Sequence, residues 1–111
     1  MPDNKPGDNK KRAAFRALVD RVRKGAGKAS AEQRTRAFAD EGLEPPLRTL
    51  ISKVATSPAD VTDADFAVAK ASGYSEDQLF ELVVCAAVGQ SARLYEAGLA
   101  ALAEASAQRE A

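Results

Sequence analysis

The sequence of 111 residues contains no histidine, no tryptophan and a single cysteine, Cys85. Histidine is the commonest general base and a frequent metal ligand, and thiol pairs build many zinc sites and dithiol redox centres. Their absence excludes zinc sites, intramolecular disulfides and most nucleophilic relays, so we expect neither a metal nor a cofactor. A lone thiol among apolar neighbours suits a reducing compartment, and we therefore expect a cytoplasmic protein.

Long apolar runs are also missing from the chain. The longest, residues 82–89, is far shorter than the roughly 20 residues that span a bilayer. The charged N-terminus is not followed by the apolar segment that directs export. We expect neither export nor membrane insertion.

Aromatic residues make up only 5% of the chain, whereas 45% of its residues are apolar and alanine is abundant. Small and aliphatic side chains favour helices over sheets, and a chain of this length can enclose one hydrophobic core. We predict an all-α fold with a single domain at residues 10–111. Residues 1–9 are rich in proline, glycine and polar side chains, and we expect them to be a disordered tail.

Apolar residues recur at helical spacing between glycines, prolines and capping residues, which divides the chain into about five helices. We predict these helices at residues 10–24, 30–41, 46–54, 62–73 and 75–102. The short helices are expected to pack on the long last one, and the alanine-rich end after Ala103 is expected to fray.

The long helix has a well-defined start. Ser75 and Gln78 have the spacing of a capping box, and Gly73 suits the left-handed residue that ends the preceding helix. Residues 79–88 are apolar on nearly every side, which indicates a buried helix.

Past Gly89 the long helix keeps one apolar stripe, formed by Leu94, Tyr95, Leu99 and Leu102. Because four short helices of one chain cannot cover this stripe, it predicts the interface of a homo-oligomer. Gly89 and Gly98 indicate either a bend or a close helix contact.

The net charge is zero, but the two parts of the chain differ in sign. Residues 1–36 carry eleven lysines and arginines against four acidic residues, whereas residues 37–111 carry five against twelve. The basic part can meet nucleic acid or an acidic lipid surface, or lie against the acidic part of its own or a neighbouring chain. We favour the latter, because a charge-rich helical face is usually a solvated face. The basic helix also lacks the second recognition helix of a DNA reader.

Glu81 is the one acid within the most apolar part of the long helix. Burial would raise its pKa and make it a candidate catalytic carboxylate, with Arg93 and Tyr95 lining the same groove. We favour the other interpretation, in which Glu81 reaches solvent beside Asp77 and Gln78 or pairs with an arginine.

Cys85 lies in mid-helix, far from the helix N-terminus or cation that would activate a thiol, and we predict a structural core residue. Asp60, Asp63 and Asp65 lack the glycine turn and distal glutamate of a calcium loop. We interpret these acids as residues of a helix start.

The turn and the long helix resemble the end of an alkylhydroperoxidase D-like, or carboxymuconolactone decarboxylase, domain. The resemblance rests on GYSEDQLFELVVCAAVG at residues 73–89, ARL at residues 92–94 and AGLAAL at residues 97–102. Such domains place a G-x-S-x-E/D turn before an alanine-rich long helix. The likeness covers residues 61–105 and implies an all-α fold that assembles into dimers, trimers or hexamers through these helices.

The peroxidases of that family use a C-x-x-C pair in the helix before this turn, a histidine one turn further on and an upstream glutamate. Residues 57–65, at the corresponding place, contain no cysteine, and Cys85 lies on a different helix. We therefore expect no thiol peroxidase activity. The decarboxylases also rely on histidine, so their activity is not supported.

These departures favour a short family member that serves for binding or assembly, as a homo-oligomer with small molecules as candidate ligands. One alternative is a carboxymuconolactone decarboxylase-like enzyme, or an accessory subunit, that uses Glu81 as an acid–base carboxylate. A second alternative is nucleic-acid binding through the basic N-terminal helix.

Overall fold

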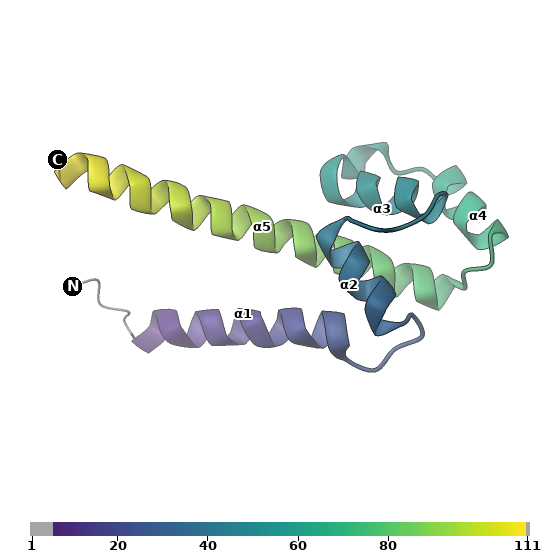
Figure 1. The fold of residues 1–111 in the computed structure, drawn as a ribbon, viewed down its shortest axis with the longest axis horizontal. Coiled ribbons are helices and arrows are strands. Elements are labelled where there is room, and N and C mark those ends of the chain that lie inside the picture. The colour runs from purple at the N-terminus through teal and green to yellow at the C-terminus, as the bar shows by residue number, and fades with distance from the viewer. Residues whose placement is uncertain (1–5, 111) are drawn as a thin grey trace.

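In a computed structural model the described part of the chain is residues 6–110, with side chains described for residues 10–109. Within it lie α1 (Pro6–Lys24), α2 (Ala31–Ala39), α3 (Leu47–Thr56), one turn of 3₁₀-helix, η1 (Pro58–Asp60), α4 (Asp63–Ala71) and α5 (Glu76–Glu110), and no strand (Figure 1). The prediction of an all-α fold with short helices packed against a long C-terminal helix is confirmed.

The long helix α5 sets the shape of the molecule. Its 35 residues rise about 1.5 Å each, or roughly 52 Å, close to the longest dimension of 56 Å. The basic helix α1 runs beside the C-terminal half of α5 in the opposite direction, whereas α3 and α4 lie at the other end (Figure 1). The basic part of the chain thus packs against its own acidic part.

The hydrophobic core lies where α2, α3 and the first half of α5 meet. Leu47, Leu50 and Ile51 of α3 face Leu79 and Leu82 of α5, all almost completely removed from solvent. Burial of each such side chain stabilises the fold by about 1.5–3 kcal/mol, so this cluster holds the short helices on α5.

Residues 79–88 are nevertheless buried on one side only. Phe80 is 70% exposed, and Ala87 also faces solvent. The expectation of a helix buried all round is therefore wrong, because the three shorter helices α2, α3 and α4 do not surround α5.

The helix start predicted at Ser75 and the positive-φ glycine predicted at Gly73 are both present in the structure. The Gln78 amide donates to Ser75 Oγ at 3.1 Å, and the Ser75 amide donates to Gln78 Oε1 at 2.9 Å, which completes the capping box. Gly73 has a φ of 113°, a conformation that residues with side chains rarely adopt.

Several predicted helix boundaries differ from the structure. The first helix begins at Pro6 and not at Lys10, so residues 6–9 of the expected tail form its first turn. Proline suits this position because it has no backbone N–H, and N–H groups in the first turn of a helix have no partner within the helix. Residues 1–5 of that tail lie outside the described residues. The second helix ends at Ala39, two residues before its predicted end at residue 41, because Asp40 takes the left-handed conformation (φ 55°).

The helix α5 extends beyond its predicted end at residue 102. The helix continues to Glu110, because alanine, glutamate, glutamine and arginine dominate this segment and no glycine or proline interrupts it. Among the described residues, no helix is both long enough and apolar enough to cross a membrane.

Candidate functional site

Glu81 lies where the loop between α1 and α2 meets α5. Its carboxylate accepts hydrogen bonds from the backbone amides of Lys28 at 2.8 Å and Ala29 at 3.0 Å. A Cβ at Gly27 would collide with Glu81 Oε1, so glycine leaves the room that this contact needs. Glu81 therefore ties the loop to the long helix.

The same two amides explain the titration of Glu81. They stabilise the charged carboxylate, and with the nearby Arg34 they lower its pKa despite partial burial. The lowered pKa of Glu81 contradicts the interpretation in which burial raises it to suit a catalytic carboxylate. An ionised carboxylate with both oxygens engaged is an anchor for the loop and a poor proton shuttle.

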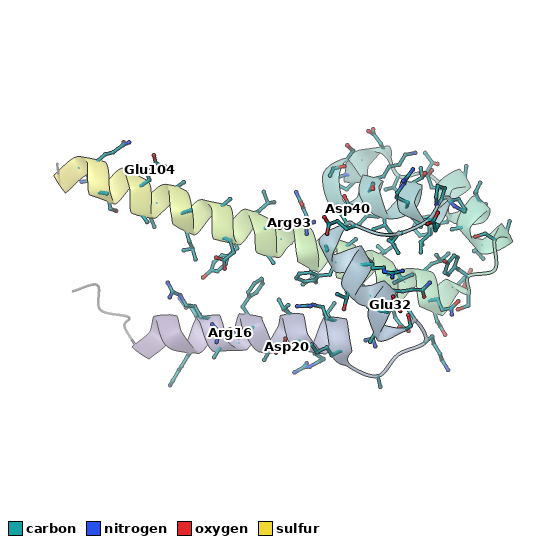
Figure 2. The ribbon with its side chains drawn as sticks, viewed as in Figure 1. Arg16, Asp20, Glu32, Asp40, Arg93 and Glu104 are labelled. Carbon is teal, nitrogen blue, oxygen red and sulfur yellow. The ribbon has the colours of Figure 1, made fainter. Side chains whose placement is uncertain are left out.

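Arg93 and Tyr95 do not join Glu81 in one groove. Arg93 Nη1 donates to the Phe38 carbonyl at 2.7 Å, where α2 ends and a cation is favourable. Tyr95 packs its ring against Phe15 of α1, with centroids 5.4 Å apart. Figure 2 shows Arg93 beside the end of α2. Glu81, Arg93 and Tyr95 therefore contact different partners and do not form one catalytic site.

Gly89 explains how the end of α2 comes so close to α5. A Cβ at Gly89 would lie 2.7 Å from the Phe38 carbonyl carbon and would overlap the carbonyl oxygen. Gly89 thus marks a close helix contact, one of the two roles expected for it. Gly98 has no atom within 4 Å of such a Cβ and makes no close contact within the chain.

Cys85 is a core residue with 1% of its surface exposed. Its Sγ lies 3.4 Å from the Val22 carbonyl oxygen, to which the thiol can donate. Burial raises its pKa to about 11, so the group is a thiol and not a nucleophilic thiolate at neutral pH.

Arg34, on α2, is a feature that the sequence analysis missed. It is the one charged side chain that is buried among the described residues, with 7% of its surface exposed. Its Nη1 donates to the Val22 carbonyl at 3.4 Å, and its Nε is buried without a hydrogen-bond partner. A sequence signal existed: Arg34 precedes the inward-facing Ala37 and Phe38 by one helical turn, on the same face of α2.

Three of the hollows on the surface are described by their lining residues. One of about 490 Å³ runs between α1 and α5 and is lined by Phe15, Val19, Tyr95, Leu99, Ala92, Arg12, Arg16 and Glu96. One of about 470 Å³ lies between α4 and α5, and one of about 210 Å³ lies beside Arg34. Within the described residues, no group of three or more acidic or cysteine side chains is placed to hold a metal ion.

The residues of the predicted oligomer stripe divide between two faces of α5. Tyr95 and Leu99 face α1 of the same chain. Leu94 and Leu102 remain 63% and 64% exposed.

Comparisons with protein-family models, curated proteins and solved structures find no match to this chain.

Proposed function

We propose that this chain is a non-redox binding or assembly protein on an alkylhydroperoxidase D-like helical scaffold, and that it forms a homo-oligomer through α5. The observation that carries this proposal is an exposed, uncharged face of α5 that runs from Ala87 to Ala105. The resemblance of residues 61–105 to that family supports the scaffold, and the single buried thiol supports the non-redox assignment.

This face, the α5 stripe, repeats every seven residues. Ala87, Leu94 and Ala101 are spaced by seven, and a second row follows each of them by four residues: Ser91, Gly98 and Ala105. All six are exposed, none is charged, and Leu102 flanks them. The pattern is that of a seam between helices, and it extends over roughly 27 Å at about 1.5 Å per residue.

A second copy of the chain suits this seam for two reasons. The exposed side chains of Leu94 and the flanking Leu102, with no charged residue in the stripe, favour burial against another apolar surface. The chain also has zero net charge, with basic residues concentrated before residue 37 and acidic residues after it. Copies therefore do not repel one another, and parts of opposite sign can face each other.

Light scattering at micromolar concentration tests self-assembly. We expect a mass that is a multiple of 11.7 kDa and a melting temperature that rises with protein concentration. Leu94→Lys should give a monomer, because it places a charge in the stripe. The matched control is Ala100→Lys, an exposed site on another face of α5 between Glu96 and Glu104, and it should leave the mass unchanged.

A monomeric wild-type protein with a concentration-independent melt would refute the proposal. Glu81 does not suit the alternative of an acid–base enzyme, because its carboxylate already accepts hydrogen bonds from two backbone amides.

A further inference from the structure

The smallest of the three hollows has the most distinctive chemistry. It measures about 210 Å³, lies at the junction of α1, α2 and α5, and is lined by Arg21, Val22, Arg34, Phe80, Glu81 and Val84. We call it the Arg34 pocket. Its volume is below the roughly 300–1,000 Å³ of pockets that hold drug-sized molecules, so it suits a small ligand.

Arg34 enters this pocket with donors that the protein does not satisfy. A guanidinium carries five N–H groups, but the one protein acceptor in contact is the Val22 carbonyl, at a long 3.4 Å. The Nε of Arg34 has no partner. No carboxylate among the described side chains forms an ion pair with Arg34. A buried cation in this state is destabilising unless an anion joins it.

Glu81 is close enough to influence Arg34 but does not neutralise the pocket. Its two oxygens accept from the Lys28 and Ala29 amides, which fixes the carboxylate on the loop. Arg21 adds a second guanidinium to the lining. The pocket thus contains two cations and one anion, so one further negative charge would balance its net positive charge.

The rest of the lining is apolar. Val22 and Val84 are partly buried, and the largely exposed ring of Phe80 forms one wall. Apolar walls beside a guanidinium suit a molecule with one charged end and a hydrocarbon chain. Glu81 disfavours a dianion such as phosphate, whereas the planar guanidinium matches a single carboxylate in shape.

We propose that the Arg34 pocket binds a small monocarboxylate, with its carboxylate on Arg34 and Arg21 and its apolar chain against Phe80 and Val84. The proposal specifies a ligand for the binding role proposed above. It does not depend on self-assembly, since light scattering and ligand titration report on the two separately.

Hexanoate is a suitable probe, and its titration can be followed by the amide signals of the isotope-labelled full chain. We expect saturable shifts at Ala26, Lys28, Phe80 and Val84, the backbone positions in or beside the pocket. Hexan-1-ol and inorganic phosphate should bind at least about tenfold more weakly, because one lacks the charge and the other carries too much.

Arg21→Gln is the main variant, because Arg21 is exposed and its loss should not unfold the protein. It should weaken hexanoate binding by about tenfold. Arg34→Gln should abolish binding, provided that its circular dichroism spectrum shows the native helix content. Arg48→Gln, at an exposed arginine on α3, is the matched control and should bind as the wild type does.

Several results would overturn the proposal. Shifts that do not saturate by about 10 mM would show that the pocket has no useful affinity. Equal binding of hexan-1-ol would show an apolar hollow without carboxylate recognition. Loss of binding in Arg16→Gln but not in Arg21→Gln would place the ligand in the groove between α1 and α5.

Discussion

At the scale of single residues, the Glu81 carboxylate links the stability of the fold to pH. The pKa of Glu81 in the folded chain lies below the ordinary 4.5. There is therefore a pH range in which Glu81 is protonated in the unfolded chain but still charged in the folded chain. The stabilisation by Glu81 is therefore full above about pH 4.5 and is lost as the pH falls through the lowered pKa.

Glu81→Gln should accordingly lower the free energy of unfolding by about 1–3 kcal/mol at neutral pH, because one of the two amides loses a charged acceptor. The difference from wild type should shrink in acid, where Glu81 is protonated as well. Urea melts at several pH values measure this. Glu104→Gln, an exposed acid on the same helix (Figure 2), should change little, and an equal loss in both variants would contradict the argument.

Cys85 offers a second test at this scale. Because the thiol is buried and its pKa is raised to about 11, a thiol reagent should label the native protein slowly at neutral pH and rapidly in denaturant. Cys85→Ala should cost about 1 kcal/mol through lost packing. Fast native labelling would mean that the sulfur is accessible and reactive.

The burial of Cys85 could be predicted because its own neighbours in sequence are apolar. The role of Glu81 could not, because its partners Lys28 and Ala29 are separated from it by 53 and 52 positions and donate through backbone atoms that carry no sequence signal. Arg34 was missed because arginine is common on solvent-facing helices, and only the alignment with Ala37 and Phe38 indicates its burial.

At the scale of helices, the two glycines of α5 should respond in opposite ways to the same substitution. Gly89→Ala should destabilise the fold by about 1–3 kcal/mol or more, because its Cβ would overlap the Phe38 carbonyl. Gly98→Ala should stabilise the helix by about 0.5–1 kcal/mol, because the Cβ meets nothing and alanine favours helix. Denaturant melts in the Leu94→Lys background keep self-assembly out of this comparison, and effects of the same sign would disprove the assigned contact.

Helix starts with a capping side chain were predictable because they depend on local chemistry, whereas the start of α1 at Pro6 was not. Ser75 and Gln78 form the predicted capping box, and Asp63 and Asp65 lie in the first turn of α4, as acids of a helix start do. Helix ends were less predictable. The sequence has no strong stop signal beyond Leu102, and whether Asp40 or Gly42 ends α2 depends on contacts such as the Ser52 hydroxyl donating to Asp40.

At the scale of the whole molecule, the core occupies one end and the two longest helices extend from it. Leu79, Leu82, Cys85 and Ala86 are buried in the first half of α5, whereas no described residue of α5 beyond Gly89 is buried to that degree. The described side chains of α1 are likewise exposed or half-buried. Composition predicted enough apolar residues for one core but could not show this uneven distribution, which depends on how the helices cross.

Hydrogen exchange should therefore divide α5 into two parts. Amides of residues 79–90 should exchange only through global unfolding, because opening them exposes the core. Those of residues 96–109, and of residues 10–18 in α1, should exchange at least about tenfold faster, because few buried contacts oppose local opening. Protection at residues 91–105 should rise with protein concentration in the wild type and not in Leu94→Lys, since only the former buries the α5 stripe. Uniform protection along α5 at low concentration would mean that α1 alone holds the distal half in place.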